Sequence, residues 1–194
     1  PPPRRGRNVP TNFLPTGDEY IRILPEIILT LAGVIIMFLE AFRSEREGSN
    51  PLSSAVTAIA LIASIAGAAF AGANMGYAFQ NMVIVDGFAT FFRIICLSVG
   101  LLTMFVSGGY LDREGAAKGE YYALMLFSLV GQSLMCAANE LVMIFIGIEI
   151  SSVATCIVAG YLKDDRRNNE SALKYFLLGS FATAFLLQTT SNSV

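Results

Sequence analysis

Long apolar segments that almost no charge interrupts are the strongest constraint on how this chain can fold. Residues 48–85 contain no Asp, Glu, Lys or Arg, and other apolar runs are bounded by single charges such as Glu26 and Glu40. Only 14% of the 194 residues are charged, whereas soluble domains carry about 25%. So little charge cannot cover a water-facing globule, and so much apolar sequence does not stay disordered. The composition therefore indicates an integral membrane protein.

The gaps between charges divide the sequence into candidate spans. A membrane-crossing helix needs about 20 apolar residues, and its backbone groups must be paired inside the segment. A β-barrel would show short alternating segments instead of these unbroken runs. We predict an all-α, polytopic transmembrane helix bundle over residues 21–190, with five clear spans and a sixth that is short. The expected spans are 21–42, 52–73, 87–107, 121–138, 141–162 and 175–190.

Basic residues are distributed unevenly between the predicted short loops, and this predicts an orientation. Loops 74–86 and 139–140 hold no Lys or Arg, and the positive-inside rule places such loops outside, together with the N-terminus. Residues 1–20 are rich in Pro and Arg without periodicity, so we predict an extramembrane tail. The arginines of this tail oppose the assignment but are outnumbered. The loops 43–51, 108–120 and 163–174, expected in the cytoplasm, hold Arg43, Arg46, Arg113, Lys118, Lys163, Arg166, Arg167 and Lys174.

Some residue types are missing from the sequence or isolated in it, and this excludes several kinds of catalytic and metal-binding site. The chain has no histidine, which removes histidine-based haem, zinc and general-base sites. Cys96, Cys136 and Cys156 lie in apolar runs without a CxxC pair, so we expect small core residues rather than disulfides or a cluster site. The net charge of −2 gives no sign of a nucleic-acid partner. We expect no metal or cofactor in this chain.

Two charges fall well inside predicted spans. Glu149 lies roughly 12 Å from the outer end of its span, and a charge at such depth costs about 2.5–3.5 kcal/mol or more. A carboxyl there can load and unload a proton, which suits a proton carrier; the alternative is a structural glutamate bonded to a neighbouring helix. Arg93 lies about 10 Å deep, where its stem allows it either to snorkel outward or to reach a carboxylate. We expect Glu26 and Glu40 at the interface.

Charged residues also precede the last apolar run. Residues 163–170 are predicted as a solvated loop, with Asn168 or Asn169 capping the last helix. Lys174 would then open that helix as an anchor on the cytoplasmic side. This interpretation places the helix start at the point where hydrophobicity begins.

Five segments carry a resemblance to a known family. They are LPEIIL at 24–29, DGFATFFR at 86–93, GEYYAL at 119–124, ANELVMIFIGIE at 138–149 and NESALKYFLLGS at 169–180. In this order they resemble segments of the subunit N family of proton-pumping NADH:quinone oxidoreductase, respiratory complex I. That family belongs to the antiporter-like membrane subunits, which contain inverted repeats and broken helices.

The resemblance implies a function for the whole protein. It implies a membrane-arm subunit that takes part in proton translocation coupled to quinone reduction, with the other membrane-arm subunits and the lipid bilayer as partners. NADH, FMN, iron–sulfur clusters and quinone would belong to the parent complex. The expected location is the bacterial inner membrane, with the mitochondrial inner and thylakoid membranes as alternatives. Two other functions stay open: a subunit of a multisubunit cation/proton antiporter, and a non-catalytic membrane scaffold or assembly fragment.

The resemblance also implies candidate site residues. Glu149 matches the family's glutamate on the fifth helix, which pairs with a lysine on a later helix and passes protons. Lys174 matches a basic position at the start of the sixth helix, Glu170 an acidic position just before it, and Arg93 a basic position on the third helix. The partner lysines would lie beyond residue 194. We therefore expect a fragment, a truncated product or one half of a split subunit.

Overall fold

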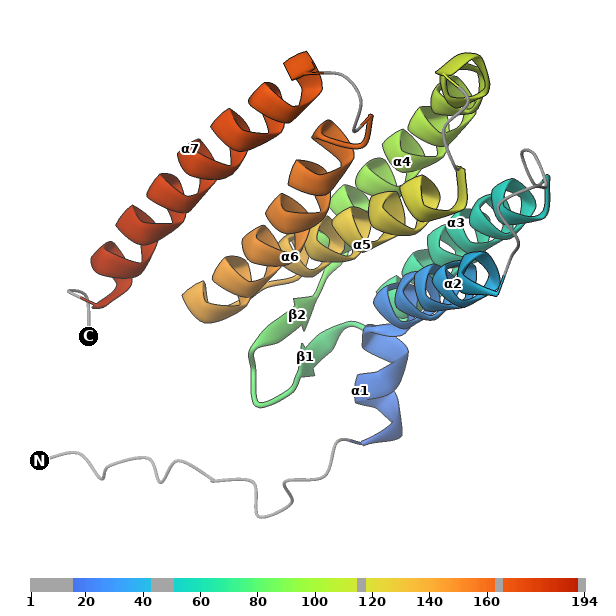
Figure 1. The fold of residues 1–194 in the computed structure, drawn as a ribbon. Helices are drawn as coiled ribbons and strands as arrows, with labels where there is room; N and C mark the ends of the chain where they lie inside the picture. Colours follow the sequence, from blue (N-terminus) through green and yellow to red (C-terminus); the bar gives the residue numbers. More distant parts are fainter. Residues whose placement is uncertain (1–15, 43–50, 115–117, 163–165, 192–194) are drawn as a thin grey trace, which may run out of the picture.

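The computed structural model describes residues 16–42, 51–114, 118–162 and 166–191. These residues form seven helices and one two-stranded hairpin, and the helices run side by side as a bundle (Figure 1). The all-α class is confirmed, and the hairpin is an addition that the sequence did not predict. The elements in chain order are α1 Gly17–Arg22, α2 Leu24–Ala41, α3 Pro51–Ala73, β1 Gly76–Ala78, β2 Val83–Val85, α4 Gly87–Glu114, α5 Lys118–Cys136, α6 Leu141–Ala159 and α7 Arg166–Ser191.

Helix α5 is the centre of the bundle. It contacts α2, α3, α4 and α6, whereas α7 packs on α6 at the edge (Figure 1). The apolar core lies around α5 and includes fully buried Leu29, Ile36, Leu61, Leu97 and Leu126. The chain therefore buries one layer of side chains at α5 and leaves the outer faces of the other helices apolar and exposed.

Four helices are long and apolar enough to cross a membrane: Leu24–Ala41, Leu52–Ala73, Gly87–Leu111 and Leu141–Ala159. They coincide with four of the predicted spans. The predicted spans 121–138 and 175–190 also form helices, α5 and α7, but neither is among these four. Helix α5 carries Glu120 and Gln132, and because other helices surround it, it does not need an apolar surface on every side.

Several predicted helix ends were wrong. Helix α4 continues to Glu114 and α7 begins at Arg166, so much of the predicted loops 108–120 and 163–174 is helical. Asn168 and Asn169 lie inside α7 and do not cap it. Hydropathy marks where an apolar surface ends, but helical hydrogen bonds continue into polar sequence. Charge pairs one turn apart support such a continuation.

The end of the predicted tail is helical. Residues from Gly17 to Arg22 form α1, and the amide of Thr16 donates to Glu19 Oε2 at 2.9 Å across its first turn. The chain then breaks at Ile23 before α2, whose first turn contains Pro25. Residues 1–15 and the basic residues Arg43, Arg46 and Lys163 lie outside the described part of the chain.

The hairpin joins two distant parts of the sequence at one end of the bundle. Its turn contains three non-glycine residues with positive φ, Phe79, Gln80 and Asn81. On one side the Arg22 guanidinium donates to the carbonyl of Asn74, just before β1, and to that of Tyr77 in β1. On the other, the amide of Ile84 donates to the Ala137 carbonyl at 2.8 Å. The hairpin therefore fixes α1 relative to the α5–α6 connection (Figure 1).

Candidate functional site

The two charges expected inside the spans have different surroundings. Arg93 on α4 is fully buried, and its Nη2 lies 2.7 Å from Oε1 of Glu26 on α2. Complete burial excludes the snorkelling alternative for Arg93. Glu26, which we expected at the interface, is only 4% exposed because α2 packs against α3 and α5 there. The structure thus confirms the alternative in which Arg93 reaches a carboxylate, and it identifies Glu26 as the partner, which the sequence did not.

Further polar groups complete this buried cluster, which we call the Arg93 cluster: Arg93, Glu26 and Ser133. The Ser133 hydroxyl donates to Glu26 Oε1 at 2.6 Å. Arg93 Nη1 donates to the Arg22 carbonyl at 3.1 Å and Nε to the Ser133 carbonyl at 3.5 Å. Glu26 Oε2 has no hydrogen-bond partner among the described residues. A buried ion pair depends on such additional bonds, because both charges have lost their water.

Glu149 lies on α6 and is only partly buried. Within the described residues, no ion pair or side-chain hydrogen bond reaches its carboxylate. The same helix meets α5 at Gly147: a Cβ placed on Gly131 would lie 2.5 Å from the Gly147 carbonyl oxygen. Glu149 therefore lies two residues from a point where two helix backbones touch, and its carboxylate has no ion-pair partner among the residues that the structure describes.

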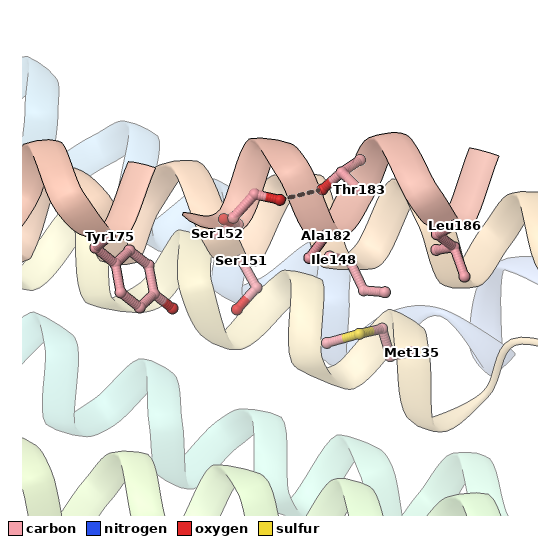
Figure 2. Close-up of a pocket in the computed structure, with 9 residues that line it drawn as sticks. Met135, Ile148, Ser151, Ser152, Tyr175, Ala182, Thr183 and Leu186 are labelled. Atoms are coloured by element: carbon pink, nitrogen blue, oxygen red, sulfur yellow. Dashed lines mark hydrogen bonds between the residues drawn. The ribbon is translucent and has the colours of Figure 1, made fainter. Parts of the chain in front are cut away.

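Hydroxyl groups gather between α5, α6 and α7, on the part of α6 that follows Glu149. A cavity of about 380 Å³ lies there, and Figure 2 shows Ser152 pointing toward Thr183 of α7. The Ser151 hydroxyl is 3.2 Å from Ser128 of α5, which is also 3.0 Å from Thr155. A site of this size and polarity can hold water. The cavity is lined by Met135, Ile148, Ser151, Ser152, Tyr175, Gly179, Ala182, Thr183 and Leu186.

Lys174 and Glu170 lie one turn apart on α7. Lys174 Nζ is 2.6 Å from Glu170 Oε1, and their side chains are 74% and 62% exposed. Neither forms an ion pair or hydrogen bond with Glu149 in the described structure. The four candidate residues are therefore divided among three places: Arg93 with Glu26, Glu149 alone, and Lys174 with Glu170 at the surface.

Sequence reasoning missed one more contact. Cys96 and Cys136, on neighbouring helices α4 and α5, have their sulfur atoms 3.9 Å apart. Both are free thiols, one turn beyond Arg93 and Ser133 respectively. Each cysteine follows a residue of the Arg93 cluster by three positions, Cys96 after Arg93 and Cys136 after Ser133. This spacing predicts a contact only when it is known that α4 packs against α5.

The fold, together with its matches to known proteins, defines a class of protein. Residues 138–191, which form α6 and α7, match a sequence model described as the NADH:quinone oxidoreductase/Mrp antiporter transmembrane family. A chain of respiratory complex I from Thermus thermophilus superimposes with a TM-score of 0.67 at 26% identity, covering 84% of this chain and 35% of that one. The class is an antiporter-like, multi-pass membrane subunit.

Sequence relatives narrow the class further. NADH-quinone oxidoreductase subunit N 1 of Solibacter usitatus is 51% identical over 170 residues, covering 88% of this chain and 35% of the relative. Subunit N 2 of Koribacter versatilis is 42% identical over 180 residues, covering 90% and 36%. The chain is a homologue of subunit N of NADH-quinone oxidoreductase. It spans about a third of the length of these relatives.

Proposed function

We propose that the chain works in the membrane arm of a bacterial NADH:quinone oxidoreductase and takes part in proton translocation coupled to quinone reduction. The observation that carries this proposal is Glu149: a partly buried carboxylate on an apolar helix, without an ion-pair partner among the described residues. It lies inside the segment that matches the antiporter family. Ionisable residues inside membrane helices usually belong to an ion path or a pair.

The surroundings of Glu149 suit proton exchange. Within the described residues, no ion pair has to break before the Glu149 carboxylate accepts a proton. The hydroxyls of Ser151, Ser152 and Thr183 face the adjacent cavity, where water could pass a proton along hydrogen bonds. The family resemblance supplies the partner of Glu149, a lysine on a helix beyond this chain. Redox chemistry, with its NADH, FMN, iron–sulfur clusters and quinone, is assigned to other subunits.

The other candidate residues take lesser roles in this proposal. Lys174 and Glu170 form an exposed pair on α7, which suits the surface of the bundle rather than an internal step of the path. Arg93 is buried with Glu26 of α2 and Ser133 of α5 and has no part in this path. The other membrane-arm subunits and the lipid bilayer are the proposed partners.

We propose a topology with five or six crossings, in which α5 crosses as a helix surrounded by protein and α7 crosses at the edge. The C-terminal ends of α2, α4 and α6 lie at one end of the bundle and the hairpin at the other (Figure 1). With the basic residues on the cytoplasmic side, the hairpin and the N-terminus would be outside the bacterial inner membrane. Residues 1–20 would be extramembrane and residues 21–190 the membrane domain.

The test replaces Glu149 in the assembled complex. Glu149→Gln removes the exchangeable charge and keeps the volume, so proton pumping should fall, and quinone reduction should fall with it where the two are tightly coupled. Glu140→Gln is the matched control, because Glu140 is exposed just before the same helix. Normal pumping by Glu149→Gln at a normal level of assembly would contradict the proposal and favour the scaffold function.

The cation/proton antiporter function is the second candidate, because the matched family includes Mrp antiporters. The subunit N relatives favour the oxidoreductase. Affinity purification of the native protein separates the two: an oxidoreductase subunit brings redox subunits with it, and an antiporter subunit does not.

A further inference from the structure

The Arg93 cluster is the most highly charged buried group in the described chain, and the proton path proposed above does not use it. Arg93 is fully buried and Glu26 nearly so. Replacing a buried ion pair by apolar residues is often neutral or stabilising, so stability alone is a weak reason for having one. A more specific role has to explain why the cluster lies where it does.

Besides its ion pair with Glu26, the Arg93 guanidinium contacts the carbonyls of two helix ends. Arg22 is the last residue of α1, so its carbonyl is among those that an ending helix leaves without an intrahelical donor. Helix α5 ends at Cys136, and the amide of Ala137 donates to Leu134 instead of Ser133. The Ser133 carbonyl is therefore free to accept from Arg93. A cation at the C-terminus of α5 also complements the helix dipole.

Helix α5 connects this cluster to the proton site. Ser133 faces Glu26 and Arg93, whereas Gly131, two residues earlier, faces α6. A Cβ on Gly131 would meet the carbonyl of Gly147, and a Cβ on Gly147 would lie 2.9 Å from the carbonyl of Gly131. With backbones this close, α6 cannot shift independently of α5 at that level. Glu149 lies half a turn further along α6.

We propose that Arg93 is a positioning residue for Glu149: with Glu26 and Ser133 it holds the end of α5, and α5 through Gly131 and Gly147 holds the part of α6 that carries the carboxylate. This inference rests on the proposed function of Glu149. It assigns the cluster no proton and no direct contact with the path. Its effect is on the place and orientation of the carboxylate.

The experiment uses the assembled complex and measures the rate of proton pumping, normalised to the amount of complex assembled, with the rate of quinone reduction recorded beside it. The double variant Glu26→Gln/Arg93→Met removes both charges while keeping the side-chain volume, so neither charge is left buried alone. We expect assembly close to normal and pumping about three- to tenfold lower, the range of coupling through packed networks. Normal pumping by this variant would overturn the proposal.

Two further variants keep the test decisive if the double variant fails to assemble, and they separate the role of the cluster from a general loss of packing. Arg93→Lys keeps the charge pair but lacks the fork that reaches both carbonyls, so assembly should be normal and pumping intermediate. Leu97→Ala damages the same face of α4 one turn later without touching the cluster. It should lower assembly but leave pumping per assembled complex unchanged. Equal pumping in Arg93→Lys and the parent would also contradict the proposal.

A last comparison distinguishes this inference from the proposed function. If Glu149→Gln pumps normally, the function proposed for Glu149 fails. If Glu149→Gln is defective but the double variant pumps normally, only the positioning role fails. The double variant is also combined with Glu149→Asp. If both changes act on the position of the same carboxylate, the combined fold loss of pumping should be smaller than the product of the two separate fold losses. A fully multiplicative loss would show that the cluster acts independently of Glu149.

Discussion

Two carboxylates on apolar helices, Glu26 and Glu149, have opposite environments. Glu26 on α2 is nearly inaccessible, with an arginine 2.7 Å away and a serine hydroxyl 2.6 Å away. Glu149 on α6 is partly exposed and has no such partner in the described chain. Both α2 and α6 pack against α5, but Glu26 faces the centre of the bundle, whereas α6 lies between α5 and the edge helix α7 among the described elements.

The difference shows what a buried carboxylate can be used for. A carboxylate that is desolvated and paired on one oxygen holds helices together, and its charge state is coupled to the fold. A carboxylate without a partner costs more when it is charged, but a proton can come and go without breaking the structure. The first arrangement suits positioning and the second suits transport.

Removing the arginine should give the largest effect on stability. Arg93→Met leaves Glu26 buried without its cation, which we expect to destabilise the fold by about 3–5 kcal/mol. Thermal unfolding of the protein in detergent measures this loss, and adding Glu26→Gln should recover most of it. Equal unfolding midpoints for Arg93→Met and the double variant would mean that Glu26 does not need its cation. The contrast drawn between Glu26 and Glu149 would then be wrong.

The second largest loss of stability should come from crowding the contact between α5 and α6. Gly131→Ala places a methyl group 2.5 Å from the Gly147 carbonyl oxygen and 2.6 Å from the Ser151 amide nitrogen. Such overpacking costs about 1–3 kcal/mol. Gly109→Ala on α4 is the matched control, since nothing lies within 4 Å of its added Cβ. The unfolding midpoint should fall for the first variant and stay or rise for the second; equal midpoints would mean that α6 is free to move away.

The stability effect of Glu149→Gln should be small even though its effect on pumping is large. No described partner is lost, so we expect a change within about 0.5 kcal/mol. Unfolding measured beside Glu26→Gln tests the comparison directly, because Glu26→Gln weakens an existing pair. A loss as large as that of Glu26→Gln would reveal a structural role for Glu149.

The surface pair on α7 should give the smallest effect. Lys174→Met removes an exposed pair one turn apart, which is worth about 0.3–0.5 kcal/mol and is screened by salt. Unfolding at low and high salt should show a difference that disappears as salt is added. A salt-independent loss would mean that Lys174 interacts with something other than Glu170.

The helices themselves could be predicted well, and their ends could not. The predicted span 52–73 coincides with the apolar helix Leu52–Ala73, because two polar boundaries enclose it. Helices α4 and α7 extend beyond their apolar parts, since hydrogen bonding along a helix does not require apolar side chains. Strands β1 and β2 are three residues each and are formed by contacts with Arg22 and Ala137, which no local pattern reveals.

The candidate site was predictable only in part. Glu149 stands out because it is the one charge within its span, a property of sequence alone. Glu26 was placed at the interface because it lies near the start of an apolar run, but sequence position does not say which face of a helix meets its neighbours. Glu170 is predicted just before the last helix and Lys174 at its start, whereas α7 begins at Arg166, because helical hydrogen bonding starts before the apolar run does.

The sequence by itself determined that the chain is a bundle of membrane helices and that Glu149 is an unusual charge within it, because hydropathy and charge spacing are local properties. Only the tertiary structure decided that Arg93 binds Glu26 and the ends of α1 and α5, and that Gly131 meets Gly147. These contacts join residues far apart in the chain. The physical reason is that desolvation and pairing depend on which helices pack together, and the order of residues does not specify that packing locally.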